Sequence, residues 1–245
     1  MVSKSEIKLI TGLHQKKYRN RHGMFVAEGI KVITELYDAG MKLRELFTTE
    51  ADRFSFAGSL VREISGDELK KVSQLKTPNK ALALFEIPKE KEIRNSGLVL
   101  ALDDIRDPGN LGTIIRLCDW FGIEDLVCSA TTVDCYNGKV VQATMGSLAR
   151  VNIVYTDLQA FIGESGLPVF IADMDGENVF ETALPQKGIL VMGNEANGIS
   201  GEIRSLADGV VSIPRFGRIQ ETESLNVATA TAILLSEFRR RGSSS

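Results

Sequence analysis

Three short segments in the second half of the chain combine glycine with amide, acidic or hydroxyl side chains. The first covers residues 103–112 (DDIRDPGNLG) and is followed by Arg116, the second covers 191–200 (VMGNEANGIS), and the third covers 212–226. Glycine lets a backbone approach a ligand closely, and the polar side chains donate or accept hydrogen bonds. The three segments therefore predict a binding site for a polar or charged ligand.

Each segment also has a purely structural explanation. Pro108-Gly109-Asn110 suits a tight turn before a helix, and Ser224 is a natural N-cap for the helix that follows it. Arg116 is one polar residue within the apolar stretch 114–118, where a structural ion pair explains it as well as a bound phosphate or carboxylate does. No segment is a P-loop or a GxGxxG fingerprint, which disfavours a Rossmann-type enzyme acting on small molecules.

Short apolar runs alternate with amphipathic stretches along the whole chain, as in α/β proteins. In the first part we expect strands at residues 24–27, 43–48 and 81–87, and helices at 30–39 and 67–75. In the second part we expect strands at 98–102, 126–129, 152–155, 169–172, 189–192 and 209–213, and helices at 111–121, 139–148, 158–164, 202–206 and 225–240. The later strands are almost continuously apolar, which predicts a parallel sheet covered on both faces. Ligands bind at the carboxyl ends of the strands in such sheets, which is where the three polar segments lie.

Charge and periodicity divide the chain into two regions. Residues 88–97 (PKEKEIRNSG) lack periodicity and predict a linker between a domain at 1–92 and a larger domain at 97–245. Residues 1–92 contain 17 Lys and Arg against 13 Asp and Glu, whereas the remainder contains 12 against 19. A basic first domain in a chain of net charge −3 predicts that a polyanion binds there, although scattered surface charge would also give these counts.

Composition argues against several other classes of protein. Cys118, Cys128 and Cys135 lie in apolar settings without a CxxC pair, which predicts buried free thiols in a reducing compartment. Neither His14 nor His22 lies near a cysteine pair, so we expect no metal site. We find no signal-peptide core and no apolar stretch of about 18 residues, which predicts a cytoplasmic protein without a membrane span.

Taken in order, the three segments resemble the motifs of the SpoU/TrmH branch of the SPOUT methyltransferases. The family pattern is Asn-x-Gly with a downstream Arg, then Gly-x-Glu-x-x-Gly, then Ile-Pro followed by Ser-Leu-Asn. The matching residues here are Asn110-Leu111-Gly112 with Arg116, residues 193–198 (GNEANG), and Ile213-Pro214 followed by Ser224-Leu225-Asn226. The loop 215–223, with Arg215, Arg218, Glu221 and Glu223, is a few residues longer than is usual in the family.

The resemblance extends over nearly the whole chain. Residues 139–150 (KVVQATMGSLAR) look like the family's middle helix and its Gly-Ser turn. Residues 13–19 (LHQKKYR) and 25–29 (FVAEG) look like its substrate-binding domain, which is similar to ribosomal protein L30e. The resemblance thus implies an L30e-like α/β domain followed by a parallel-sheet α/β domain with a deep C-terminal trefoil knot.

The same resemblance implies an activity. It implies an enzyme that uses S-adenosylmethionine to methylate RNA, expected at a ribose 2′-hydroxyl of ribosomal RNA, and a homodimer formed through the catalytic domain. A transfer RNA substrate, or a non-catalytic RNA-binding module on the same scaffold, is the alternative.

The resemblance also implies roles for individual residues. The expected cofactor-binding residues are Met192, Gly193, Asn194, Glu195, Ile213, Pro214, Ser224 and Leu225. The expected catalytic residues are Asn110, Arg116, Glu195, Ser224 and Asn226. Because arginine does not readily lose its proton in a protein, we expect Arg116 to hold an RNA phosphate and stabilise the developing alkoxide rather than act as the base.

The first domain contains a candidate contact for the RNA. Lys16, Lys17, Arg19 and Arg21 surround Tyr18, a composition suited to phosphates and one stacked base. A solvated basic helix face is the alternative explanation of this cluster.

Overall fold

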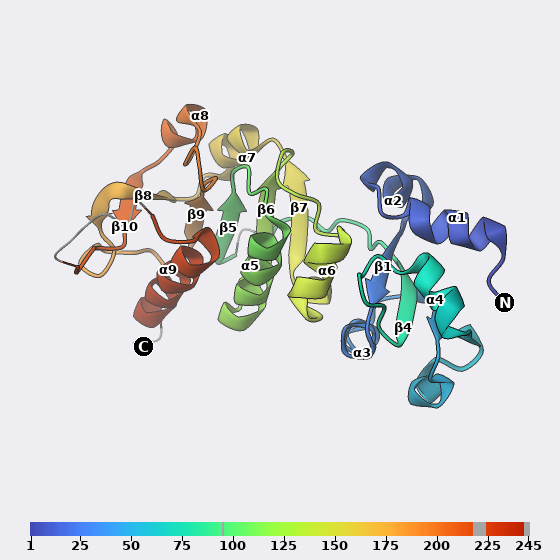
Figure 1. Ribbon diagram of the computed structural model, residues 1–245. Coiled ribbons are helices and arrows are strands. Elements are labelled where there is room, and N and C mark those ends of the chain that lie inside the picture. Colours follow the sequence, from blue (N-terminus) through green and yellow to red (C-terminus); the bar gives the residue numbers. More distant parts are fainter. Residues whose placement is uncertain (95, 218–223, 243–245) are drawn as a thin grey trace. The chain divides into compact units, whose positions relative to one another are not determined.

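The computed structural model describes residues 1–94, 96–217 and 224–242, which form two compact units (Figure 1). The first unit combines Met1–Lys89 with Asp134–Arg150, and the second combines Glu90–Val133 with the rest of the chain from Val151. The polypeptide therefore passes between the two units three times, after Lys89, Val133 and Arg150.

The first unit is built on a mixed four-stranded sheet in the order β1-β4-β2-β3. β1 (Met24–Glu28) and β2 (Leu43–Thr48) lie antiparallel to β4 (Ala81–Glu86), and the short β3 (Val61–Glu63) lies parallel to β2. The helices of this unit are α1 (Lys4–Gly12), α2 (Lys16–His22), α3 (Ile30–Asp38), α4 (Gly66–Val72) and α6 (Gly138–Thr144), with 3-10 segments η1 (Ala51–Leu60) and η2 (Ser147–Ala149).

Capping boxes begin two of these helices. The Ser3 hydroxyl accepts the Glu6 amide at the start of α1 while Glu6 accepts the Ser3 amide, and Ser65 and Glu68 repeat the arrangement at α4. This Ser-x-x-Glu pattern satisfies amides that have no partner inside the helix. A shared apolar core then joins both helices to the sheet; it contains Ile10, Leu13, Val26, Phe47, Leu69, Val72, Leu82 and Leu84.

The second unit contains a six-stranded sheet in the order β10-β8-β9-β5-β6-β7, and every pair of neighbours is parallel. Its strands are β5 (Leu98–Leu102), β6 (Asp125–Ser129), β7 (Asn152–Thr156), β8 (Val169–Asn178), β9 (Gly188–Met192) and β10 (Gly209–Ser212). Its helices are α5 (Pro108–Phe121), α7 (Leu158–Ser165), α8 (Gly201–Arg204) and α9 (Val227–Gly242). The predicted parallel α/β fold is confirmed, and the trefoil knot stays a prediction from the resemblance.

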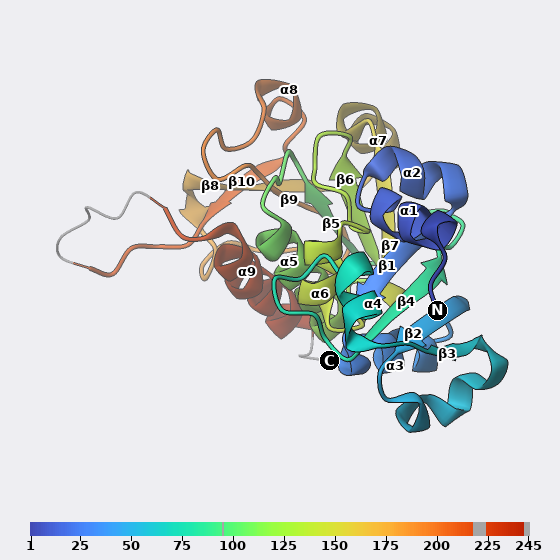
Figure 2. The same ribbon diagram turned by 45° about the vertical axis from the view of Figure 1, so that its right-hand side comes forward.

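Helices cover the second sheet on both faces. Figures 1 and 2 show α5 and α9 together on one side of it and α7 and α8 on the other. Leu158 and Ile162 of α7 and Ile203 of α8 pack in one core with alternate strand residues such as Val99 and Ile189. The remaining residues of β5 and β9 are buried as well, which explains their continuously apolar sequence.

The structure differs from the predicted elements in several places. Helices α1 and α2, the 3-10 segment η1 and strand β3 were not among the predictions, and the helix predicted at 139–148 ends at Thr144. Strand β8 continues through polar residues to Asn178 beside β10, past a register shift in β10. The predicted N-cap of the last helix, Ser224, is wrong. The Asn226 Oδ1 accepts the amides of Ala228 and Thr229, so Asn226 caps α9.

Two smaller predictions concern the cysteines and a membrane span. Cys118, Cys128 and Cys135 are buried free cysteines, which confirms that prediction. Within the described part of the chain, no helix is both long and apolar enough to cross a membrane.

Candidate active site

The three polar segments meet at the carboxyl edge of the second sheet. β5 and β9 are neighbours, and the Asp103 amide donates to the carbonyl of Met192 over 2.9 Å where the two strands end. Parallel strands bring the loops at their carboxyl ends to one edge, so segments far apart in the sequence become adjacent.

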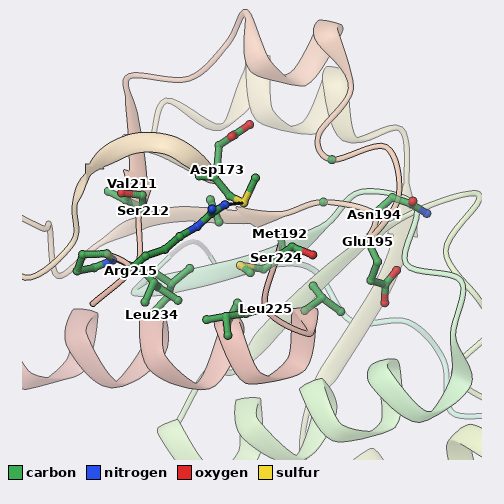
Figure 3. A pocket seen from close by; sticks show the side chains of 18 of the residues that line it. Asp173, Met192, Asn194, Glu195, Val211, Ser212, Arg215, Ser224, Leu225 and Leu234 are labelled. Atoms are coloured by element: carbon green, nitrogen blue, oxygen red, sulfur yellow. Dashed lines mark hydrogen bonds between the residues drawn. The ribbon is translucent and has the colours of Figure 1, made fainter. Parts of the chain in front are cut away.

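A cavity of about 530 Å³ opens at this edge, within the range of small-molecule sites (Figure 3). The structure brings all eight expected cofactor-binding residues to its wall, namely Met192, Gly193, Asn194, Glu195, Ile213, Pro214, Ser224 and Leu225. The sequence analysis did not identify other lining residues, which include Ala172, Asp173 and Met174 of β8, Arg215 and Phe216 after β10, and Leu234 of α9. The side chain of Arg215 lies across the cavity, where its guanidinium donates to the Met174 sulfur.

A tight turn between Asn194 and Gly198 forms one end of the cavity. The Asn194 amide donates to the Gly198 carbonyl over 3.0 Å, and the Gly198 amide donates back over 2.9 Å. A Cβ on Gly193 would lie 2.5 Å from the carbonyl carbon of Gly198, so only glycine fits there. Gly198 has φ +68°, a conformation that also favours glycine.

Three expected catalytic side chains form a chain of hydrogen bonds beside this turn. The Asn110 Nδ2 donates to the Glu195 Oε1 over 2.5 Å, and the Asn226 Nδ2 donates to the Asn110 Oδ1 over 2.9 Å. The Asn226 oxygen is already occupied by the amides that it caps, so its NH2 group must face Asn110. Asn110 then has its own NH2 group left for the carboxylate, and the orientation of both amides is fixed.

Asn110 is placed by the start of α5. Asp107 is the N-cap and accepts the Asn110 amide over 2.8 Å, while Pro108 occupies the first turn, where it needs no amide partner. In the loop before this helix, a hydrogen bond to Asp104 raises the pKa of the exposed Arg106 guanidinium. Ser224, the fourth expected catalytic residue, lines the cavity and is exposed.

Arg116 stands apart from this group. It lies on α5 beyond Asn110, is exposed and is not among the lining residues of the cavity. Within the described residues, no hydrogen bond or ion pair engages its guanidinium, which argues against a structural ion pair. Trp120, one turn further along α5, is 83% exposed.

The structure corrects the prediction that Arg19 contacts RNA. The Arg19 side chain is only 3% exposed, because its guanidinium forms an ion pair with Asp134 and donates to the carbonyls of Leu13 (2.8 Å) and His14 (2.9 Å). These contacts hold α2 within the first unit. A residue of this kind cannot be distinguished from its exposed neighbours by sequence, since its acidic partner lies 115 positions away.

The other members of the basic cluster lie at the surface of α2. Lys16, Lys17 and Arg21 are exposed, and Tyr18 is half-buried. The ammonium group of Lys17 lies 5.1 Å from the centre of the Tyr18 ring. These four residues therefore remain a candidate RNA contact, whereas Arg218, Glu221 and Glu223 of the long loop lie outside the described residues.

The cavity suits S-adenosylmethionine in size and lining. Its wall combines apolar side chains, such as Leu225, Val227 and Leu234, with backbone groups of the two glycine-containing loops and with carboxylate and hydroxyl side chains. In the described ranges, no group of three His, Cys, Asp or Glu side chains could hold a metal ion.

Comparison with known proteins decides the family. The model of the SpoU rRNA methylase family matches residues 97–236. The chain belongs to this family. As a SpoU methylase it is an S-adenosylmethionine-dependent RNA methyltransferase, and residues 4–83 match the MRM3-like substrate-binding domain.

Similar proteins match this SpoU methylase along nearly its whole length. The 23S rRNA (guanosine(2553)-2′-O)-methyltransferase RlmP of Bacillus subtilis is 30% identical over 93% of both chains. The structure of a putative RNA methyltransferase of the TrmH family from Porphyromonas gingivalis is 39% identical, with a TM-score of 0.88 over 98% of this chain and 99% of that one. The AdoMet-bound rRNA methyltransferase from Sinorhizobium meliloti is 31% identical, with a TM-score of 0.84 over 98% and 97%.

Proposed function

We propose that this chain methylates a ribose 2′-hydroxyl of ribosomal RNA, with S-adenosylmethionine as the methyl donor. The observation that carries the proposal is the cavity lined by all eight motif residues, with Asn110, Glu195 and Asn226 hydrogen-bonded at its edge. The names of similar proteins, such as the 2′-O-methyltransferase RlmP, support the ribose and the ribosomal RNA as the target. This substrate also favours the cytoplasm as the place of action.

The bound cofactor supplies an electrophilic methyl group on a sulfonium. The backbone around Gly193 and Ile213 and the apolar side chains of Leu225 and Leu234 would hold it. Holding two reactants in line is worth roughly 7–11 kcal/mol of an activation barrier, so a protein can catalyse this displacement mainly by alignment.

The polar side chains would handle the ribose and its proton. Asn110, oriented by Glu195 and Asn226, would hydrogen-bond the attacking hydroxyl. The new carbon–oxygen bond forms as the sulfur–carbon bond breaks, and the hydroxyl proton leaves to a phosphate oxygen or to water. Arg116 would hold the adjacent phosphate and stabilise the developing alkoxide, since arginine keeps its own proton.

The position of Arg116 supports a homodimer. Six residues of α-helix turn a side chain by about 600°, so Arg116 points away from the face of α5 that carries Asn110. Its exposed guanidinium and the exposed Trp120 indole share the side of α5 that would face a second copy. We propose that each subunit contributes Arg116 to the site of its partner.

Complementation between two inactive variants tests this arrangement. Arg116→Ala and Glu195→Gln should each leave only a small residual rate of methyl transfer, while Arg116→Ala leaves cofactor affinity unchanged. Mixing the two after unfolding and refolding should restore about one quarter of wild-type activity, because half of the dimers are mixed and each has one intact site. No recovery, with mixed dimers shown to be present, would mean that Arg116 acts within its own chain or only in folding.

Mapping of 2′-O-methyl groups tests the substrate. Ribosomal RNA from cells that lack the protein should lose one such group, and the purified protein should restore it in vitro. A missing group in transfer RNA would overturn the choice of ribosomal RNA, and binding without any transfer would favour the non-catalytic module.

The first unit would supply RNA affinity through α2. Changing Lys16, Lys17 and Arg21 to Ala should lower the salt dependence of RNA binding by about 2 in log–log slope, at roughly 0.7 for each phosphate that the protein no longer neutralises. The matched control changes Lys70, Lys71 and Lys76, which are also exposed lysines of the first unit. An equal change of slope in both triple variants would mean that α2 is only a solvated basic face.

A further inference from the structure

Asp104, in the loop after β5, has a backbone conformation that residues other than glycine rarely adopt. Its φ is +60°, and Met145 is the only other non-glycine residue with a positive φ among the described residues. Such conformations persist where surrounding contacts enforce them, and they concentrate at functional sites. Asp104 lies within the first polar segment but outside its Asn-x-Gly motif, and the sequence predicted no role for it.

Contacts hold Asp104 on both sides. Its amide donates to the Ser129 Oγ over 2.9 Å, and the Ser129 hydroxyl is itself bonded to the Thr132 hydroxyl at 3.0 Å. Its carbonyl oxygen accepts the Asn194 Nδ2 over 2.8 Å, and its carboxylate lies 3.3 Å from the same nitrogen. The left-handed backbone thus turns two acceptors of Asp104 toward one amide group.

The Asn194 side chain connects Asp104 to the turn that carries Glu195. The Asn194 side chain is buried, and its Oδ1 accepts the amides of Ala196 (2.9 Å) and Asn197 (3.1 Å). Residues 195–198 are exposed, so little packing holds this turn from outside. The position of the Glu195 carboxylate therefore depends on how firmly the Asn194 side chain is held.

We propose that Asp104 is a positioning residue for methyl transfer, which fixes the side chain of Asn194 and thereby places the Glu195 carboxylate against Asn110. The inference rests on the proposed function, because the Glu195–Asn110 contact matters to catalysis only if Asn110 orients the ribose. Asp104 itself does not line the cavity.

The test compares two substitutions that both tolerate a positive φ. Asp104→Gly allows the same backbone conformation but removes the carboxylate. Glycine also lets the loop adopt other backbone conformations. We expect kcat to fall about 10- to 100-fold, since misplacing a reacting group by about 1 Å can cost roughly 100-fold. The KM for RNA should stay within about threefold of wild type, so that the loss appears mainly in kcat. Asp104→Asn keeps an acceptor oxygen and the tolerance for a left-handed φ, so it should retain kcat within about threefold.

Two controls separate positioning from damage to the fold. Met145→Gly places glycine at the other left-handed residue, in the first unit, and should leave kcat unchanged. Arg106→Ala removes the ion-pair partner of Asp104 but not its contacts to Asn194, and it too should retain kcat.

A double-mutant cycle identifies the route of the effect. If Asp104 acts through Glu195, Asp104→Gly should cause no further loss in a Glu195→Gln background that retains measurable activity. Multiplied losses, or an unchanged kcat for Asp104→Gly alone, would overturn the inference while leaving the proposed function intact.

Hydrogen exchange gives a readout that does not require activity. The amides of Ala196 and Asn197 should exchange faster in Asp104→Gly than in wild type, because their acceptor on Asn194 is loosened. Unchanged exchange of these amides would overturn the inference whether or not the wild-type protein transfers a methyl group. Absence of methyl transfer by the wild-type protein would by itself contradict only the proposed function.

Discussion

Replacing Arg19 with methionine should severely destabilise the first unit. The substitution keeps an apolar stem of similar length but removes the guanidinium that pairs with Asp134 and donates to the carbonyls of Leu13 and His14. The Asp134 side chain is only 13% exposed, so its charge would remain poorly solvated without a partner.

The expected cost follows from these contacts. Removing one partner of a buried ion pair costs about 3–5 kcal/mol, because the other charge is left uncompensated. Each carbonyl that water cannot reach adds about 1–3 kcal/mol at most. We therefore expect Arg19→Met to lower the free energy of unfolding by at least about 3 kcal/mol, a large fraction of the roughly 5–15 kcal/mol typical of a domain.

Equilibrium unfolding in urea, followed by circular dichroism, measures this change. With a slope of about 2 kcal/mol per molar urea, the midpoint of the first unit should fall by at least about 1.5 M. Arg21→Met on the exposed side of the same helix is the matched control and should stay within about 0.5 kcal/mol of wild type. The double variant Arg19→Met with Asp134→Leu should regain part of the loss, since no charge is left behind. A single variant within about 1 kcal/mol of wild type, or a double variant that is less stable than the single one, would refute the reasoning.

Three further predictions address the cofactor, the thiols and the first helix. Gly193→Ala should weaken S-adenosylmethionine binding at least about tenfold in calorimetry, because a Cβ would lie 2.5 Å from Gly198, whereas Gly201→Ala, with nothing within 4 Å, should bind normally. Burial raises the pKa of the Cys118 thiol, so the native protein should not react with Ellman's reagent until denaturant is added; rapid native labelling would contradict this. Hydrogen bonds from Ser3 lower the pKa of Glu6 to about 2, so the stability it contributes is present above about pH 4.5 and is lost as the pH falls through 2. The melting temperature of Glu6→Gln should therefore lie slightly below that of wild type at neutral pH, and the two should coincide once the pH is below the lowered pKa of Glu6. A difference in melting temperature that does not change with pH would contradict this role of Glu6.

Apolar periodicity predicted most of the second unit. Strands such as β5 and β9 are buried on both faces, so their sequences are runs of apolar residues that are easily recognised. Parallel pairing of these strands then requires that the loops after them lie at one edge of the sheet. The location of the candidate site followed from this requirement, and the resemblance to the SpoU/TrmH motifs pointed to Asn110, Glu195 and Asn226.

Features that depend on distant partners could not be predicted. The sequence of α2 (KKYRNRH) has no apolar stripe, and Arg19 is buried only because Asp134 and two carbonyls satisfy it. The left-handed backbone of Asp104 is likewise imposed by Ser129 and Asn194, and nothing in its neighbouring residues signals it. The polar half of β8 lacks the alternation of a half-buried strand because it extends beyond β9 and pairs only with the edge strand β10.

The threefold passage of the chain between its units has a consequence for protein engineering and for evolution. Residues Asp134–Arg150 are encoded inside the catalytic half but fold with the first unit, where Asp134 neutralises Arg19 and the Tyr136 ring lies 4.9 Å from that of Phe25. A genetic exchange at the single linker 88–97 would therefore separate a substrate-binding unit from part of its own interior. Chimaeras that carry a foreign N-terminal half should be viable only if this internal insert is exchanged with it, so the two stretches must be inherited and must diverge as a pair.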